Sequence, residues 1–207
     1  QMIEGGFILG SDLENINPSS LDLSLSEEIY RLEGGIFQPR YGEKIHDSLK
    51  ELELSQHDFK YALERDVAYL CRLNESLRLP ESVYGYCNPK SSTGRNDIQV
   101  RLLADGVSRF DAVSPAGFSG ELWLAICPKS FPIKISPGEK LNQLRLFNED
   151  TRFDELELQI AFKKDKLLWD EYNGRPFSYD DIKIRDNDGS LILTVDLQSD
   201  VIGYECR

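Results

Sequence analysis

Histidine is scarce in this sequence, and its scarcity argues against a zinc enzyme. The 207 residues include two histidines, His46 and His57, and each is followed by aspartate. Neither stands in the H-x-E element of one class of zinc hydrolases, and no P-C-x-x-C element accompanies them. We therefore expect no zinc and no other metal held by the protein. We interpret both histidines as solvated surface residues.

Cysteines are also few, and their spacing is not typical of a disulfide framework. The sequence has four, Cys71, Cys87, Cys127 and Cys206, and a chain of this length can bury a core without cross-links. No apolar run approaches the roughly 20 residues of a membrane span, and no charged-then-apolar export signal opens the chain. These features predict reduced thiols, no membrane partner and a cytoplasmic location. Because residue 1 is Gln, we expect the native N-terminus to lie upstream.

Positive charge is in the minority. Lys and Arg total 24 against 36 Asp and Glu, which gives a net charge of −12. A negative field repels phosphate backbones, so we expect no nucleic-acid partner, and any phosphate site must be a small basic island. The sequence has no G-x-x-x-x-G-K-[ST] run, and neither Gly-Gly pair precedes a helix suitable for a dinucleotide-binding unit. A Ser-His-Asp catalytic triad is disfavoured because nothing in the sequence places a serine on the sharp, strained strand-to-helix turn that exposes such a nucleophile.

Short segments of alternating apolar residues dominate the chain. They occur at residues 16–25, 66–73, 82–86, 98–103, 120–127, 131–135, 140–147 and 155–162, separated by Gly and Pro turns. Such alternation predicts strands with one buried face. Many short strands joined by such turns favour a β-sandwich, a jelly roll or a distorted barrel.

One helix and a change of composition complete the predicted organisation. Ile45, Leu49 and Leu52 have helical spacing, which predicts a short helix within residues 43–55. After about residue 164 the chain becomes polar and turn-rich, until a last strand signal at residues 191–197. We therefore predict one domain over residues 1–164, followed by a polar excursion and a strand over residues 165–207.

The stretch NPKSSTGR, residues 88–95, combines charges, hydroxyls and a glycine. Lys90 supplies a point charge and Arg95 a fork of donors. Ser91 and Ser92 add hydroxyls and backbone amides, and Gly94 lets a ligand approach the chain closely. This combination predicts a polyphosphate site. A solvated turn with incidental charges is the structural alternative.

Four ordered motifs resemble the deoxycytidine triphosphate deaminase family, within the trimeric dUTPase superfamily. In this chain they are INPSSLDLSL at residues 16–25, ESLRLPESVYGYCNPKSSTGR at 75–95, RFDAVSPAGFSGELW at 109–123 and ISPGEKLNQLRLF at 135–147. The family patterns they are similar to are I-Q-P-S-S-x-D-L-x-L, E-S-x-x-L-P-x-x-V-x-G followed by a basic residue and S-S-x-G/A-R, R-x-D-x-G-[WY]-x-G, and P-G-x-x-[IL]-x-Q-[LI]-x-F. The resemblance covers roughly residues 1–150. It implies a mainly β, dUTPase-like distorted jelly roll or barrel with a few short helices. It is most similar to the first half of a longer tandem-domain form, in which case the native chain continues past Arg207.

The resemblance also implies an activity and a ligand. Members of the family convert dCTP and water to dUTP and ammonia without zinc, and their magnesium is carried by the triphosphate. Ser91, Ser92 and Arg95 would contact that triphosphate, with Lys90 at the family's basic position. The site would form between the subunits of a trimer, or of a pseudo-trimer if the native chain has two repeats.

Three further residues enter the candidate site through the resemblance. Arg109 and Asp111 would frame the sugar or the base, and Gln143 would belong to the strand beneath the pocket. For Gln143, a buried amide that serves backbone groups is an equally good explanation. The candidate catalytic residues are Ser91, Arg95 and Asp111.

The general base expected from the family is missing. The family has a glutamate five residues past the second glycine of its turn, where it takes a proton from the attacking water. Five residues past Gly120 this chain has Ala125. Glu121 shares the strand face of Ala125 but lies about 13 Å away along the strand. Three alternatives remain: a deaminase with its base elsewhere, a dUTPase or bifunctional deaminase–hydrolase, and a non-catalytic nucleotide-binding half.

Strand alternation predicts where Ala125 points. Leu122, Leu124 and Ile126 form an aliphatic face that suits the core. We therefore expect Ala125 on the opposite face, looking toward the nucleotide pocket.

Overall fold

The structure is a computed structural model of the chain. It describes residues 1–33, 37–52, 54–149, 153–170, 172–182, 184–185, 190–191, 198 and 200–201. The chain divides into two compact units, Gln1–Glu149 and Asp150–Arg207, called below the first and second units. The predicted domains placed this division later, between residues 164 and 165. Among the described residues, no helix is long and apolar enough to cross a membrane.

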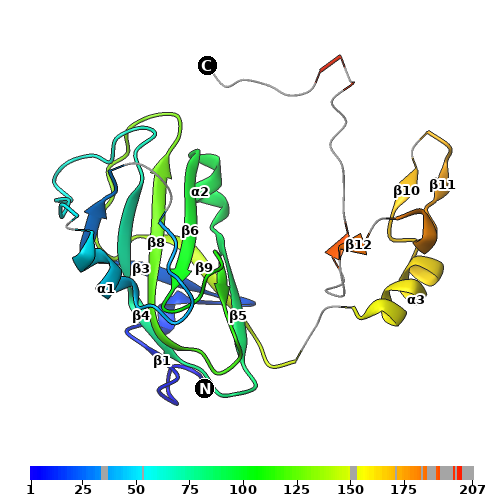
Figure 1. The fold of residues 1–207 in the computed structure, drawn as a ribbon, viewed down its shortest axis with the longest axis horizontal. Helices are drawn as coiled ribbons and strands as arrows, with labels where there is room; N and C mark the ends of the chain where they lie inside the picture. The colour runs from blue at the N-terminus through cyan, green and yellow to red at the C-terminus, as the bar shows by residue number, and fades with distance from the viewer. Residues whose placement is uncertain are drawn as a thin grey trace. The chain divides into compact units, whose positions relative to one another are not determined.

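An antiparallel sheet of nine strands forms the first unit (Figure 1). Seven strands are hydrogen-bonded in the order β6 (Ile98–Ala104), β8 (Ser119–Pro128), β4 (Tyr69–Arg78), β3 (Ser20–Arg31), β9 (Lys140–Phe147), β5 (Tyr84–Pro89) and β7 (Ala112–Val113). Two short strands complete it: β1 (Ile8–Leu9) pairs with β4, and β2 (Ile16–Asn17) pairs with β3. The helical segments of this unit are η1 (Leu13–Asn15), α1 (Ile45–Glu51) and α2 (Ser91–Arg95). The helix predicted within residues 43–55 is confirmed as α1.

Asp111 links two separate parts of the sheet, β6 and β5. Its backbone N–H donates to the Leu102 carbonyl on β6 at 2.9 Å, and its carbonyl accepts the Cys87 N–H on β5 at 2.8 Å. The φ angle of Asp111 is 60°, a left-handed conformation that is uncommon for a residue with a side chain. Through this residue the sheet closes nearly into a barrel, and the predicted mainly β fold is confirmed.

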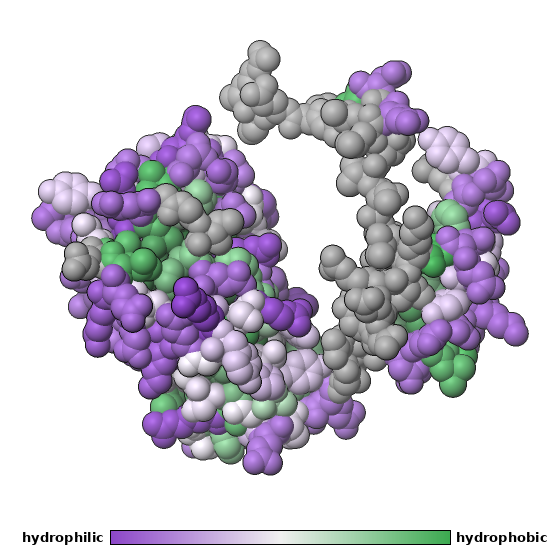
Figure 2. Space-filling view, in the orientation of Figure 1, coloured by the Kyte–Doolittle hydropathy of each residue, from purple (hydrophilic) through white to green (hydrophobic). Residues whose placement is uncertain are grey.

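Two hydrophobic clusters lie on opposite faces of β8. Leu122, Leu124 and Ile126 point into the main core, as their alternation predicted. Trp123 points the other way, into a second cluster that it shares with Leu32, Ile45, Leu49, Leu70 and Leu103. Since two of these residues come from α1, that helix packs on the outer face of the sheet around Trp123. The visible surface of the first unit is largely hydrophilic, with smaller hydrophobic areas (Figure 2).

Two predicted strands are wrong. Residues 155–162 lie in α3 (Glu155–Asp165), although their apolar residues alternate. The helix begins with a capping box: Asp154 Oδ1 accepts the Glu157 N–H at 2.8 Å, and Glu157 Oε2 accepts the Asp154 N–H at 3.0 Å. Its buried residues, Leu158, Ala161 and Phe162, have helical spacing. In residues 131–135, Ile133 forms only an isolated bridge with Leu63.

The second unit contains α3 and several short elements. They are β10 (Trp169–Asp170) paired with β11 (Arg175–Pro176), η2 (Tyr179–Asp181), and β12 (Ile184–Arg185) paired with β13 (Ser190–Leu191). The rings of Phe162 on α3 and Tyr179 in η2 pack edge to face at 6.2 Å. This contact places α3 with the polar segment that follows it. Of the strand predicted at residues 191–197, all but Leu191 lies outside the described residues.

Candidate functional site

Helix α2 presents three predicted site residues on the surface. It follows β5 directly, and its residues Ser91, Ser92 and Arg95 are exposed. Thr93 is the buried member of this helix, and its hydroxyl donates to the Leu141 carbonyl on β9 at 2.9 Å. Thr93 therefore fixes α2 against the sheet, while two serine hydroxyls and one guanidinium face solvent.

A row of polar side chains crosses three strands beside α2. Gln143 on β9 pairs directly with Asp22 on β3 and with Asn88 on β5, so the three side chains share one face of the sheet. Gln143 is half-buried, and its Oε1 accepts the Ser20 hydroxyl at 3.0 Å. The Ser20 side chain therefore holds the oxygen of this amide. Because Asn88 is three residues before Ser91, the row reaches the start of α2.

Lys90 lies between β5 and α2, and its charge is already paired. Its Nζ forms an ion pair with Asp22 Oδ2, and the two side chains are 28% and 10% exposed. The Lys90 N–H donates to the Leu141 carbonyl at 3.0 Å. These contacts anchor the segment that leads into α2. A role for Lys90 as a phosphate ligand stays a prediction.

The side chain of Asp111 is engaged on both carboxylate oxygens. Oδ1 accepts the Leu102 N–H at 2.9 Å, and Oδ2 forms an ion pair with Arg101. Burial, and after it the charge of Asp111, raises the pKa of Cys87.

Arg109 is exposed and has no ion-pair partner within 4 Å in the described part of the chain. Across the described ranges, no hydrogen bond or ion pair joins Arg109 or Asp111 to α2.

Ala125 occupies the strand position at which the resemblance expects a glutamate. It is half-buried, pairs with Leu70 on β4 and Arg101 on β6, and packs against the second hydrophobic cluster. Arg101, which is opposite position 125 in the strand register, forms an ion pair with Asp111. Glu121 lies further along the strand and binds a different arginine, Arg72, at 2.6 Å.

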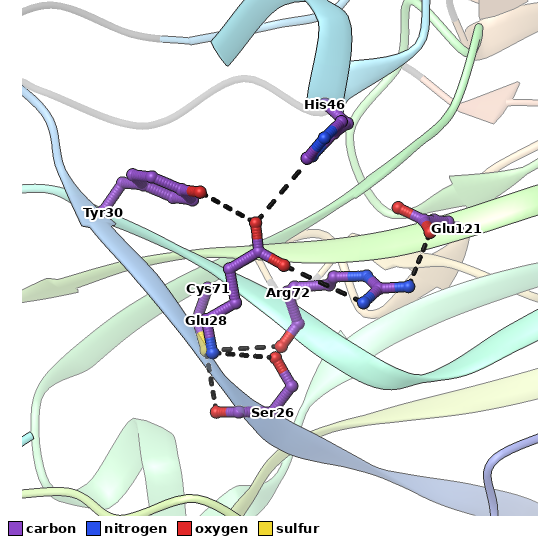
Figure 3. Close-up of polar contacts among 7 residues, drawn as sticks. All are labelled: Ser26, Glu28, Tyr30, His46, Cys71, Arg72 and Glu121. Carbon is purple, nitrogen blue, oxygen red and sulfur yellow. Dashed lines mark hydrogen bonds and ion pairs between the residues drawn. The ribbon is translucent and has the colours of Figure 1, made fainter. Parts of the chain in front are cut away.

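A second polar cluster, which the sequence did not predict, joins α1 to β3, β4 and β8 (Figure 3). Arg72 Nη2 lies 2.6 Å from Glu121 Oε1, and its Nη1 lies 3.8 Å from Glu28 Oε2. Glu28 Oε1 accepts the Tyr30 hydroxyl at 2.8 Å and lies 3.8 Å from His46 Nδ1. Burial, and then the contact with Glu28, raises the pKa of Tyr30 to about 12.

Four members of this cluster, Glu28, His46, Arg72 and Glu121, line an open cavity of about 760 Å³. The guanidinium and both carboxylates are already engaged with one another, so the cluster ties the strands together. Its members are dispersed along the chain, and no local motif could have revealed them. His46, predicted to be a solvated surface residue, has a side chain that is 47% exposed.

Metal-binding side chains are not gathered anywhere in the described residues. Within them, no group of three or more His, Cys, Asp or Glu side chains is placed to hold a metal ion. Cys71, Cys87 and Cys127 are free thiols. Burial raises the pKa of Cys71 to about 12, against a smaller opposite effect of its hydrogen bond to Ser26.

A family model and two proteins of known name match this chain. A family model described as the 2′-deoxycytidine 5′-triphosphate deaminase (DCD) N-terminal domain matches residues 2–150. A "dCTP deaminase, dUMP-forming" from Parafrankia sp. (strain EAN1pec) is 31% identical over 137 residues, which are 66% of this chain and 65% of that protein. A "probable deoxyuridine 5′-triphosphate nucleotidohydrolase" from Methanopyrus kandleri is 29% identical over 148 residues, which are 69% of this chain and 88% of that protein.

A solved structure agrees with these matches. The crystal structure of 2′-deoxycytidine 5′-triphosphate deaminase from Agrobacterium tumefaciens superposes with a TM-score of 0.69 and 34% identity. The superposition covers 79% of this chain and 50% of that one. The chain therefore spans half of the solved deaminase and 65% of the Parafrankia protein. The resemblance and the dUTPase-like fold predicted from the sequence are confirmed.

Proposed function

Because this chain belongs to the family of dCTP deaminase N-terminal domains, we propose that it is the nucleotide-binding part of a zinc-independent dCTP deaminase. The complete enzyme converts dCTP and water to dUTP and ammonia. One observation carries the proposal: α2, fixed by Thr93, presents Ser91, Ser92 and Arg95 beside the polar row that contains Gln143. Hydroxyls and a guanidinium suit the acceptor oxygens of a triphosphate.

The chemistry of deamination sets what the complete site must supply. The water oxygen bonds to C4 of cytosine while one water proton is transferred to N3. The exocyclic C4–N4 bond then breaks as the amine takes up the second water proton and leaves as ammonia. A general base must reach the water within about 3 Å, or through one further water. Ala125 cannot accept a proton, Glu121 is bound to Arg72, and Asp111 is bound to Arg101.

These observations separate nucleotide binding from catalysis. Loss of a positioned base slows a reaction by roughly 10²–10⁴-fold. We therefore expect the chain by itself to bind dCTP and to release ammonia slowly. In the limiting case this half of the protein binds nucleotide and releases no ammonia, and the catalytic residues lie in another part of the protein.

Hydrolysis of dUTP is a second candidate activity, alone or together with deamination. The similarity to a probable deoxyuridine 5′-triphosphate nucleotidohydrolase, of which 88% is aligned, favours it. Ala125 weakens deamination specifically, because hydrolysis of the triphosphate does not require a base beside the cytosine ring. Ammonia release from dCTP, measured beside pyrophosphate release from dUTP, separates the two activities.

Binding is tested by thermal unfolding with dCTP or dUTP and magnesium. A ligand that binds the folded state raises the melting temperature by linkage. Arg95→Ala should remove most of this rise, because it deletes a charged donor that can bind phosphate in a bidentate manner. Arg78→Ala is the matched control, since Arg78 is an exposed arginine on β4. An equal rise in the original chain and in Arg95→Ala contradicts the assignment.

The proposed ligand set contains no metal held by the protein alone. We propose dCTP or dUTP as the ligand, with magnesium carried by the triphosphate and no zinc. Elemental analysis of the purified chain tests the zinc part. One tightly held zinc ion per chain would overturn the zinc-independent mechanism.

A further inference from the structure

A groove beside α2 adds a second wall to the proposed site. Its volume is about 560 Å³, and its lining comes from α2, the start of β6 and β9, and the segment 131–135. Ser92 and Asn96 belong to its α2 side, and Lys134 and Lys140 to the other. Ser92 is also part of the triphosphate motif, so the motif and the groove share this residue.

The two lysines give this groove a positive balance in an acidic protein. Neither lysine has an ion-pair partner within 4 Å among the described residues. Glu139 also lines the groove, and its Oε1 accepts the Ser136 N–H at 3.0 Å. The two lysines and the one glutamate give the lining of the groove a net charge of +1. The net charge of the whole chain is −12. The groove is thus the kind of basic island that a phosphate site requires in such a chain.

Lys90 cannot supply the same charge without a cost. Its ammonium group is paired with Asp22, whose side chain is only 10% exposed. Drawing Lys90 toward a phosphate would leave a buried carboxylate unpaired, which is strongly unfavourable. Besides Arg95 on α2, the groove beside Ser92 offers Lys134 and Lys140, neither of which is held in such an ion pair among the described residues.

We propose that the phosphate chain of the nucleotide lies in this groove, between Ser92 and the pair Lys134 and Lys140. Each ammonium group is a compact point charge for phosphate oxygens, and the Ser92 hydroxyl and the Asn96 amide can donate hydrogen bonds to the same oxygens. A volume of about 560 Å³ falls within the range typical of small-molecule sites. This inference rests on the proposed nucleotide binding and adds the direction in which the phosphates extend from α2.

Calorimetric titration with inorganic triphosphate at low salt tests the groove on the whole chain. Lys134→Ala and Lys140→Ala should each weaken binding roughly tenfold, as the loss of a charged hydrogen bond does. Glu139→Gln should strengthen binding, because it removes the negative charge of the lining. Lys50→Ala is the matched control, since Lys50 is an exposed lysine of α1 that does not line the groove.

The outcomes distinguish this inference from the function on which it rests. Weaker binding by both lysine variants, with tighter binding by Glu139→Gln, supports the groove. If triphosphate binds the lysine variants as well as the original chain, while Arg95→Ala loses binding, the groove is wrong and the proposed function stands. If the original chain binds neither triphosphate nor dCTP, the proposed function fails, and the groove assignment fails with it.

Discussion

Ala125 on β8 lies directly opposite Arg101 on β6. Side chains that face each other in antiparallel strands have Cβ atoms about 5 Å apart. Arg101 is therefore the cross-strand neighbour of the position at which the family expects its glutamate, and it binds Asp111. A carboxylate introduced at position 125 would therefore lie beside this guanidinium.

The first prediction restores that carboxylate. Ala125→Glu should raise ammonia release from dCTP by at least about tenfold, because a positioned base contributes roughly 10²–10⁴. Ala125→Gln has the same shape but cannot accept a proton, so it should leave the rate unchanged. An ammonia assay with dCTP and magnesium compares the three chains. Equal rates for Glu and Gln, or brisk turnover by the original chain, would show that the base lies elsewhere.

The second prediction concerns the ion pair between Lys90 and Asp22. Lys90→Ala should lower the free energy of unfolding by about 3 kcal/mol, because it leaves the Asp22 carboxylate buried and unpaired. Replacing both partners, by Lys90→Met with Asp22→Asn, should recover most of this loss. Lys60→Ala is the control, because its pair with Asp58 is exposed and contributes little. Urea unfolding measures all four chains, and equal stability of Lys90→Ala and the original chain would contradict the account.

Gly94 offers a third prediction that separates stability from binding. A Cβ at this position would meet nothing within 4 Å, and Gly94 lies inside α2. Gly94→Ala should therefore keep or slightly raise stability, since alanine is the better helix former by about 1 kcal/mol. The added methyl group should weaken dCTP binding roughly tenfold, comparable with the loss of one charged hydrogen bond. Unchanged affinity, measured beside the melting temperature, would mean that the ligand does not approach Gly94.

Local patterns predicted most of the sheet. In β6 the buried residues Ile98, Val100 and Leu102 alternate with the exposed residues Gln99 and Arg101, so the strand and its core face could be read directly. α3 was misread because its apolar residues alternate as in a strand, while its helical signals are the capping box and the burial of residues three and four apart. Local spacing alone could not decide between these two patterns.

Contacts between distant parts of the chain could not be predicted in this way. Lys90 has the character of a phosphate ligand in its own segment, but its partner Asp22 is 68 residues away. The pairing of Glu121 with Arg72 likewise joins β8 to β4. The sequence therefore identified candidate groups, and the fold decided which of them are already bound.

The fourth prediction concerns assembly. In a single chain, Arg109 and the α2 residues Ser91, Ser92 and Arg95 are exposed, and no described contact joins Arg109 to α2. A neighbouring subunit can bring such separate halves of a site together. We predict a trimer, or a pseudo-trimer if the native chain carries two repeats, by light scattering at several concentrations. A stable monomer with full nucleotide affinity would refute a shared site.

Glu75 is a buried carboxylate that the proposed reaction does not use. It is 0% exposed, and its two oxygens accept the Ser24 N–H and the Ser24 hydroxyl, each at 2.9 Å. Burial raises the pKa of Glu75 above its ordinary value of 4.5, and the bonds from Ser24 and the charge of Lys140 oppose that rise. Because Ser24 follows Asp22 on β3 by two residues, Glu75 also helps to hold the strand that carries the partner of Lys90.

The last prediction follows from the raised pKa of Glu75. The folded chain binds a proton at Glu75 more readily than the unfolded chain does. The contribution of this protonation to the free energy of unfolding is therefore fully present below pH 4.5. It is lost as the pH rises through the pKa of Glu75 in the folded chain. The stability of the original chain relative to Glu75→Gln should therefore increase as the pH falls from neutral toward 4.5. Urea unfolding of both chains between neutral pH and pH 4.5 measures the difference in their free energies of unfolding. The other carboxylates are present in both chains, so their titration largely cancels in this difference. A difference that does not change with pH, or that shrinks on acidification, would show that Glu75 does not titrate in the folded chain as its burial requires.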